Sequence, residues 1–318
     1  MTLAVSISLA GQMVGTGGIG LAAYPPDAVL VMDFETNVYG VSGSVTALAS
    51  LLGLTRSTVG IYVDSTGNLQ SAPVDQPRFD WTTGRRSLLV EPAATRINSY
   101  PGFGSAGWTA QSATQTALGE LALGVFPGVR VAGTGNDWNR TAQNIAVTNG
   151  MTYAIQAYAR SGSGRLRIDL RNTGNSNTSR AIGTFGAVAT SVAAAGTLTV
   201  LGQVLQSDGQ IYKIDLAYTA NFTGTLQVGF GPDSNTAGHY VDLFGVQIEA
   251  GAQPSSITIA SLTRAADVAS ITPVLGATDL AVTYGDGSAA SFSAAALDGD
   301  YWPPLTQTRV RSIIGTLP

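Results

Sequence analysis

The sequence predicts a mainly β protein, and three observations lead to this prediction. Its 318 residues include 39 glycines and only 11% charged residues, a composition that suits turns and strands better than helix interiors. Hydrophobic residues make up 44% of the chain, enough to bury more than one core. In the central part, apolar residues recur at every second position in short runs that turns separate, as in a β-sandwich.

Four segments are expected along the chain. They are an N-terminal apolar arm (1–24), a small β-rich connector module (25–100), a central jelly-roll β-sandwich (101–252) and a short C-terminal β-hairpin extension (253–318). The arm is uncharged, and because the first basic residue is Arg56, it lacks the positive start of a secretory signal. Glycines interrupt it, which argues against a membrane span. We interpret the arm as a strand and a glycine-rich segment that another chain or domain covers; the alternative is an ordinary first strand of the next domain.

The connector module should be compact and rich in turns. Residues 28–34 resemble a buried strand, and a short helix is expected to end near Gly53. Two strand-like pieces then flank the turn at 64–67, and prolines bracket short extended segments beyond it. We interpret three charged residues of this module as an internal salt-bridge and turn set rather than as a ligand site: Arg56, Arg78 and Asp80.

The sandwich strands carry polar faces rich in arginine. In 165–171 the apolar residues alternate with arginine and aspartate, so each type occupies one face. We expect these faces to line one concave glycan-binding surface, with Arg165 and Arg167 exposed on it and aromatic rings as stacking platforms for sugars. The predicted site residues are Tyr158, Arg160, Arg165, Arg167, Asp169 and Lys213, with Trp108 and Trp138 in flanking loops. The alternatives are a merely solvated outer face and tryptophans that belong to the core.

Metal binding and catalysis find little support in the sequence. Cysteine is absent and His239 is the single histidine, which excludes thiolate and histidine-based zinc sites within one chain. No pair of carboxylates stands out, so no catalytic residue is predicted and the chain is not expected to be an enzyme. A structural calcium is considered at Asp242, and the alternative there is a strand aspartate satisfied by backbone or arginine. Sixteen basic against twenty acidic residues make nucleic acid an unsuitable partner.

The C-terminal extension shows one hairpin pattern. In 279–294, two alternating runs flank Gly285, Asp286 and Gly287, which form a turn signal. A further apolar strand is expected at 309–314. The extension should therefore add strands to the fold.

Two stretches of the sequence carry a recognisable pattern. The first is 54–98, with Thr55-Arg56-Ser57, Tyr62, Asp64, Gly67, Pro77 to Asp80 and Leu88 to Glu91 as matching residues. The second is 241–256 followed by 263–271, with Gly245, Gln247, Glu249 and Gly251. Through these residues the chain resembles fibre, spike and tail-associated proteins of tailed bacteriophages and gene transfer particles. Ser87 stands where this pattern usually has glycine, and Arg96 where it more often has asparagine.

The resemblance implies a structural protein of a virion appendage, a fibre or spike on head or tail, with a carbohydrate-binding-like jelly roll. Such a protein would lie on the virion surface, contact other virion proteins through residues 1–24, form a homo-oligomer and bind a host-surface polysaccharide during adsorption. A polysaccharide-degrading spike and a purely architectural virion protein remain as alternatives.

Overall fold

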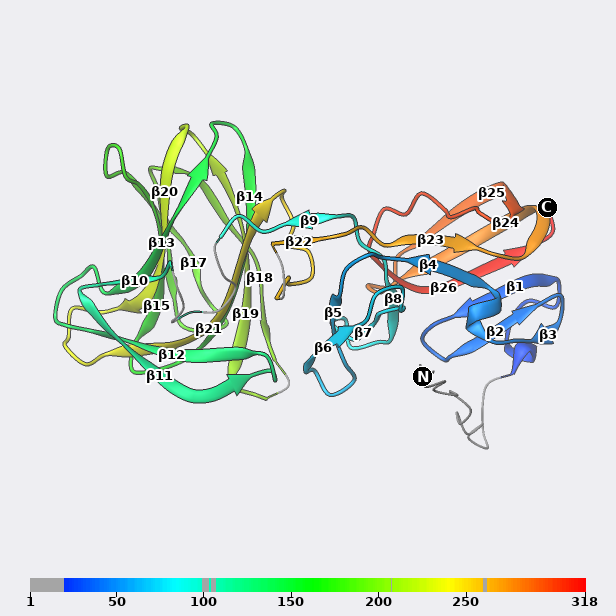
Figure 1. Cartoon of the computed structure of the whole chain (residues 1–318), viewed down its shortest axis with the longest axis horizontal. Coiled ribbons are helices and arrows are strands. Elements are labelled where there is room, and N and C mark those ends of the chain that lie inside the picture. Colours follow the sequence, from blue (N-terminus) through cyan, green and yellow to red (C-terminus); the bar gives the residue numbers. More distant parts are fainter. Residues whose placement is uncertain (1–19, 99–102, 104–106, 207, 260–261) are drawn as a thin grey trace, which may run out of the picture. The chain divides into compact units, whose positions relative to one another are not determined.

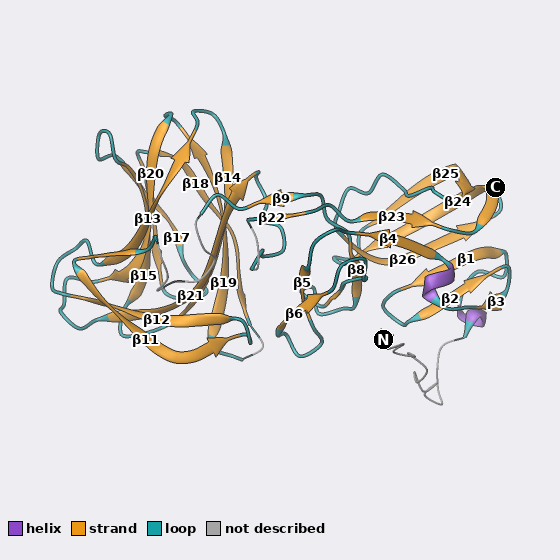
Figure 2. Ribbon diagram, viewed as in Figure 1, coloured by secondary structure: helices purple, strands orange, loops and turns teal. Residues whose placement is uncertain are grey.

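The computed structural model describes residues 20–98, 103, 107–206, 208–259 and 262–318 (Figure 1). Strands make up most of this part, so the predicted mainly β fold is confirmed (Figure 2). The short helix expected before Gly53 is a single 3-10 turn, η2 (Leu48–Ser50), and a second one is η1 (Leu21–Ala23). Within these ranges no helix has the length and apolar character that crossing a membrane requires. Residues 1–19 of the predicted arm lie outside the described residues.

The chain forms two compact units. The first combines Met1–Gly53 with Ser270–Pro318, and the second is Leu54–Ala269. This division differs from the four predicted segments, because residues that were assigned to the connector and to the C-terminal extension build one sheet together. Strand β1 (Ala28–Asp33) pairs antiparallel with β26 (Arg309–Thr316), and Val31 lies opposite Ile314. Pairing between strands so distant in sequence leaves no local signal from which a boundary could be predicted.

The first unit is built on one antiparallel sheet. Along the sheet the strands follow the order β25-β24-β26-β1-β2-β3. The new members are β25 (Ala289–Asp298), β24 (Val274–Tyr284), β2 (Val38–Val41) and β3 (Ser44–Val45). The predicted hairpin is confirmed by β24 and β25, in which Leu280 lies opposite Phe292, and Gly287 takes the positive φ of +89° that its turn requires. Leu30, Val282 and Ile313 are fully or almost fully buried.

The second unit contains an antiparallel β-sandwich of two six-stranded sheets. The β15 sheet has the order β10 (Thr109–Gln111), β13 (Arg140–Val147), β20 (Gly224–Asp233), β15 (Arg165–Asn172), β16 (Thr178–Gly183) and β17 (Ala189–Ala193). The β14 sheet has the order β11 (Ala113–Ala122), β12 (Phe126–Gly133), β21 (Tyr240–Ala250), β14 (Thr152–Arg160), β19 (Ile211–Ala220) and β18 (Gly196–Leu205). One apolar core joins them, with Ile155 from β14 and Ile168 and Phe230 from the β15 sheet. A sandwich core of this kind is what the alternating sequence pattern predicts.

The period-two pattern places the polar residues on the outer faces. Leu166, Ile168 and Leu170 belong to the sandwich core, so Arg167 and Asp169 between them face outward. Strand β14 behaves in the same way: Ile155, Ala157 and Ala159 belong to the core, and Tyr158 faces outward. Each sheet therefore has a polar outer face, and these two faces belong to opposite sides of the sandwich.

The connector covers part of the outer face of the β14 sheet. A second apolar cluster joins Tyr158, Phe126 and Phe244 of that sheet to Ile61 and Leu69 of the connector. Ile61 and Leu69 lie on the paired strands β5 (Gly60–Val63) and β6 (Leu69–Ala72). The remaining short strands are β4 (Leu52–Thr55), β7 (Phe79–Asp80), β8 (Ser87–Leu89), β9 (Ala94–Thr95), β22 (Thr263–Arg264) and β23 (Val268–Ile271).

Candidate functional site

Three arginines converge on one aspartate at the outer face of the β15 sheet. Asp169 lies on β15, opposite Arg180 of β16, and Arg140 begins β13. Arg180 Nε donates to Asp169 Oδ1 at 2.6 Å, and Arg140 Nη1 donates to Oδ2 at 3.1 Å. The Nε of Arg167 lies 3.2 Å from the same Oδ2. A single carboxylate therefore serves three guanidinium groups.

An exposed tryptophan completes this group. Trp138 precedes β13 and is 41% exposed. Its ring centroid lies 4.9 Å from the guanidinium carbon of Arg140 and 5.7 Å from those of Arg171 and Arg180, within the range of cation–π attraction. These contacts hold the ring at the surface. We call the set Trp138, Arg140, Arg167, Asp169, Arg171 and Arg180 the Trp138 cluster.

Positive charge is in excess within the Trp138 cluster. Burial lowers the pKa of Arg140, Asp169 partly offsets this, and the neighbouring Arg167 and Arg171 lower it further. The pKa of Arg167 is also lowered, first by burial, while Asp169 raises it and Arg180 lowers it. The buried Nε of Arg167 forms an ion pair with Asp169 but no hydrogen bond, and the buried Nε of Arg171 has no hydrogen-bond acceptor among the described residues. Because arginine stays charged, an added anion would relieve this excess.

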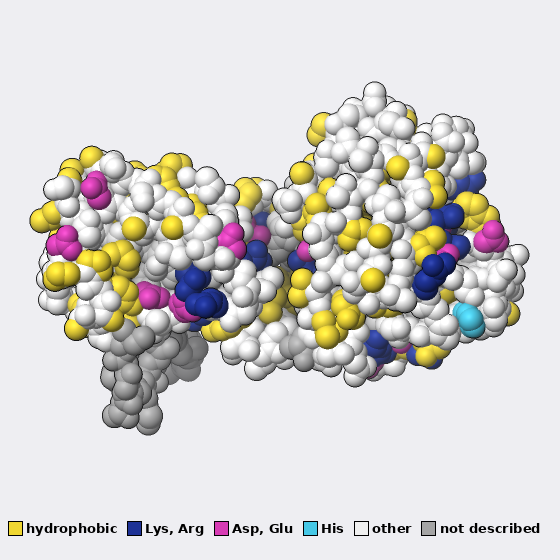
Figure 3. All heavy atoms as spheres, turned by 180° about the vertical axis from the view of Figure 1, so that it is seen from behind, with side chains coloured by type: hydrophobic (Ala, Val, Ile, Leu, Met, Phe, Trp, Pro, Cys, Tyr) yellow, Lys and Arg dark blue, Asp and Glu magenta, His cyan; other side chains and the backbone are white. Residues whose placement is uncertain are grey.

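The loop beside the cluster contains the single histidine. His239 Nδ1 lies 2.8 Å from the Ser234 hydroxyl, and the Ser234 carbonyl accepts a hydrogen bond from Asn139 at 2.5 Å. Basic side chains gather on the surface of the second unit on the side where the histidine is seen (Figure 3). His239 therefore has a structural role in this loop.

The structure divides the predicted site residues between two sheets. Arg165, Arg167 and Asp169 lie on β15, whereas Tyr158, Arg160 and Lys213 lie on β14 and β19 of the other sheet, so these six residues do not converge. The physical reason is that alternation along one strand identifies a polar face but not the sheet that the strand joins. Tyr158 is only 3% exposed and its ring packs 5.2 Å from that of Phe126. Lys213 pairs with Asp215 at 2.9 Å.

Two further expectations about exposure are corrected. Trp108 is 7% exposed, and its ring lies 4.7 Å from that of Phe103 and 6.1 Å from that of Phe230, so it is a core residue rather than a stacking platform. Arg165 is exposed and pairs with Asp233, but the side chain of Arg167 is only 3% exposed. Arg167 is buried because its neighbours on the sheet, Arg140 and Arg180, close over Asp169 together with it.

Asp242 is engaged by arginines. Its two carboxylate oxygens accept hydrogen bonds from Arg130 at 2.8 and 3.1 Å, and Oδ2 also accepts one from Arg160 at 3.0 Å. This arrangement matches the alternative to calcium binding, a strand aspartate satisfied by arginine. Across the described ranges, no three acidic or histidine side chains are grouped as a metal site would need.

Sequence reasoning missed two members of the Trp138 cluster, Arg140 and Arg180. Arg171 was placed on the polar face of 165–171 but was not among the predicted site residues. The nearest signal is the two-residue spacing of Trp138 and Arg140, which in an extended segment places both side chains on one face, within reach of a cation–π contact. Arg180 carried no signal, because its approach to Asp169 depends on the pairing of β15 with β16.

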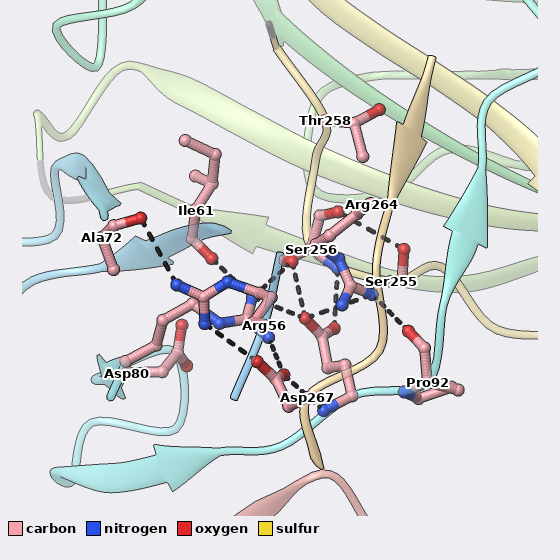
Figure 4. A network of polar contacts seen from close by, with 12 residues as sticks. Arg56, Ile61, Ala72, Asp80, Pro92, Ser255, Ser256, Thr258, Arg264 and Asp267 are labelled. Carbon is pink, nitrogen blue, oxygen red and sulfur yellow. Dashed lines mark hydrogen bonds and ion pairs between the residues drawn. The ribbon is translucent and has the colours of Figure 1, made fainter. Parts of the chain in front are cut away.

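A second, buried group of charges joins the connector to residues 264 and 267 (Figure 4). Arg56 Nη1 lies 2.9 Å from Asp267 Oδ1, and Arg78 contacts both Asp267 and, at 2.7 Å, Glu91. Arg264 lies 3.5 Å from the same Glu91 oxygen. We call Arg56, Arg78, Glu91, Arg264 and Asp267 the connector network; none of these side chains is more than 4% exposed.

The connector network confirms the predicted internal role of Arg56 and Arg78. Asp80 stabilises a turn, as predicted: its carboxylate accepts hydrogen bonds from the backbone amides of Val63 and Thr82, each at 3.0 Å. Burial alone would raise the pKa of Glu91, but Arg78, Arg264 and hydrogen bonds from Ser256 outweigh this and lower it to about 2. Glu91 is thus held as a carboxylate inside the fold.

The likeness of this chain to known proteins is structural. No protein-family model matches the chain, and no curated protein matches it. Among solved structures, the chain is similar to the CBM22-1 xylan-binding domain of Xyn10C from Paenibacillus barcinonensis, with 16% identity and a TM-score of 0.33 over 51% of this chain and 94% of that one. The resemblance to phage appendage proteins is not tested by these matches and stays a prediction.

Proposed function

We propose that the chain is a non-catalytic glycan-binding protein and that the Trp138 cluster binds an acidic polysaccharide. The observation that carries this proposal is the exposed Trp138 ring, surrounded by three guanidinium groups within 6 Å. An aromatic face fits the apolar C–H side of a sugar ring, and guanidinium forks bind carboxylates or sulfates in a bidentate manner. The cluster offers both kinds of contact on one surface.

The charge balance favours an anionic ligand over a neutral one. Asp169 is the carboxylate that Arg140, Arg167 and Arg180 share, and Asp233 lies 3.9 Å from Arg167 as a more distant partner. The two most buried of these arginines still have lowered pKa values. A carboxylate from a uronic acid would supply the missing negative charge. Acidic polysaccharide is therefore the ligand class that this site fits best.

Binding is favoured over polysaccharide cleavage by the state of the acidic residues. A glycosidase needs two carboxyl groups that face the scissile bond. Both oxygens of Asp169 are occupied by arginines, and Asp233 pairs with Arg165. Carboxylates held in this way serve as counterions.

The wider role that we propose is that of a virion appendage protein. The sequence resemblance of 54–98, 241–256 and 263–271 supports it, and the polysaccharide would then be a host-surface receptor. In this proposal residues 1–24 attach the chain to other virion proteins, and the copies assemble into a homo-oligomer. Deletion of 2–20 is expected to leave a soluble, folded protein that no longer joins particles; normal incorporation of the deleted chain would contradict this part of the proposal.

The glycan site is tested with two variants that each remove one positive charge. Arg171→Ala removes a cation that contacts Trp138, whereas Lys213→Ala removes one from the other sheet. Titration calorimetry with oligogalacturonate is expected to show about tenfold weaker binding for Arg171→Ala, the effect of roughly 1.4 kcal/mol. Lys213→Ala should bind as the wild type does. Equal losses in both variants, or none in either, would overturn the assignment of the site.

A further inference from the structure

A polar pocket opens beside Arg140 on the same face of the β15 sheet. Its volume is about 550 Å³, and strands β10, β13 and β20 contribute to its wall. Its apolar lining residues include Ile97, Ala142 and Leu262. Five lining residues carry amide side chains: Asn98, Gln111, Gln143, Asn144 and Gln227. No residue of the predicted glycan site lines this pocket.

Arg140 fixes the orientation of two amide side chains of the pocket, those of Gln111 and Gln227. Its Nε lies 2.8 Å from Gln111 Oε1 and its Nη2 lies 2.7 Å from Gln227 Oε1. Because a guanidinium group only donates hydrogen bonds, these amides must turn their oxygens towards it. The NH₂ groups of Gln111 and Gln227 therefore point away from Arg140.

The hydrogen-bonded series of amide side chains ends in NH₂ groups that donate to no described residue. Gln227 Nε2 donates to Asn144 Oδ1 at 3.4 Å, so Asn144 turns its own NH₂ group away from Gln227. Neither Asn144 Nδ2 nor Gln111 Nε2 has an acceptor among the described residues. The pocket thus presents N–H donors next to short apolar side chains.

We propose that this pocket binds the acetyl group of an acetylated sugar residue. An acetyl carbonyl accepts hydrogen bonds from the Asn144 and Gln111 donors, and its methyl group, which has no hydrogen-bonding capacity, contacts the apolar wall. This inference rests on the proposed glycan-binding function. Both N-acetyl and O-acetyl substituents carry this chemistry.

Arg140 connects the pocket to the Trp138 cluster. The same guanidinium group that orients Gln111 and Gln227 also donates to Asp169 and lies 4.9 Å from the Trp138 ring centroid. Pocket and cluster therefore suit neighbouring residues of one polysaccharide. An acidic sugar binds at the cluster, and the adjacent acetylated sugar binds in the pocket.

The experiment compares probes that differ only in acetylation. One pair is O-acetylated oligogalacturonate and its saponified product, which carry the same charge. The other pair is a hyaluronan octasaccharide and its N-formyl counterpart, which keeps the amide carbonyl and lacks the methyl group. One of the two pairs should show a preference for its acetylated member. For oligogalacturonate, where the whole acetyl group is removed, we expect about tenfold tighter binding of the acetylated probe. For hyaluronan, where only the methyl group is removed, we expect about fourfold tighter binding. Saturation-transfer NMR should then show its strongest signal at the acetyl methyl protons.

Two variants assign the preference to the pocket. Asn144→Ala removes an exposed donor of the pocket, and Asn149→Ala is the matched control on the turn after β13. Asn144→Ala should abolish the preference for the acetylated probe while the saponified probe binds as before; Asn149→Ala should change neither.

The outcomes separate the inference from the function on which it rests. If the wild type binds acidic probes without regard to acetylation, or if the preference persists in Asn144→Ala, the pocket assignment is overturned and the glycan-binding proposal stands. If the wild type binds no acidic probe at all, both are overturned.

Discussion

The connector network and the Trp138 cluster differ in how their arginines are compensated. In the connector network three arginines meet two carboxylates, and backbone carbonyls accept further bonds, as that of Pro73 does from Arg56 at 2.7 Å. The Trp138 cluster contains four arginines and one carboxylate, Asp169, which three of the arginines contact, and the ring beside them is exposed. One group is closed and nearly balanced, whereas the other is open and carries surplus positive charge.

This difference shows which feature separates architecture from binding. Both groups contain buried arginines, so arginine content does not distinguish them. What distinguishes the two groups is the number of carboxylates available to the arginines and the aromatic surface that each group leaves exposed. We therefore expect substitutions in the connector network to act on stability and substitutions in the Trp138 cluster to act more on ligand affinity.

The largest effect is expected from Asp267→Ala. This change leaves Arg56 and Arg78 buried without their shared carboxylate, which should lower the free energy of unfolding by about 3–5 kcal/mol. Calorimetric melting measures the loss. Glu120→Ala, which breaks an exposed pair with Arg160, serves as control and should cost less than about 1 kcal/mol. If both variants melt alike, the connector network does not hold the unit together.

Acid should weaken the connector network through Glu91. Its pKa falls from 4.5 to about 2 on folding, so its contribution is complete above pH 4.5 and is lost as the pH falls towards 2. The contribution is on the order of 3 kcal/mol. Denaturant unfolding across this range should show it, and Glu91→Gln should flatten the dependence. The neighbouring Glu249, whose pKa burial raises, acts in the opposite sense and is present in both proteins. An unchanged pH dependence in Glu91→Gln would contradict the prediction.

Arg167→Ala should have an intermediate effect. Asp169 keeps two other arginines, so the loss in unfolding free energy is expected to be about 1.5–3 kcal/mol, less than for Asp267→Ala. Arg165→Ala removes an exposed pair from the same strand and should cost less than about 1 kcal/mol. Thermal melting of the two variants side by side measures this difference in unfolding free energy. Equal stability of the two variants would mean that the buried contacts of Arg167 contribute no more to stability than the exposed pair of Arg165.

The smallest effect on stability is expected from Trp138→Ala. The ring is exposed, so the free energy of unfolding should change by no more than about 0.5 kcal/mol. Binding of oligogalacturonate, in contrast, should weaken at least about tenfold. Loss of folding in this variant would place Trp138 among the structural residues and remove the main support for the glycan site.

Local sequence patterns predicted the fold class, the outward position of Arg167 and Asp169 and the hairpin of β24 and β25. These features depend on alternation and turn residues within a short stretch. Which sheet contains Tyr158, and how deeply Trp108 is buried, depend on pairing between distant strands. Arg180 and Arg140 reach Asp169 only through that pairing, which is why these two members of the Trp138 cluster were not predicted.

The pairing of β1 with β26 has a consequence for the order in which the protein folds. The strands of the sandwich lie in one continuous stretch, so the second unit is complete in the chain before residues 309–316 are synthesised. Until then one edge of β1 has no partner strand, and closing so long a loop is slow. A chain shortened before residue 309 should therefore keep the amides of the sandwich protected from hydrogen exchange, while the β1 amides on the edge that faces β26 exchange freely. We expect the continuous unit to fold first during synthesis and the discontinuous unit to fold last.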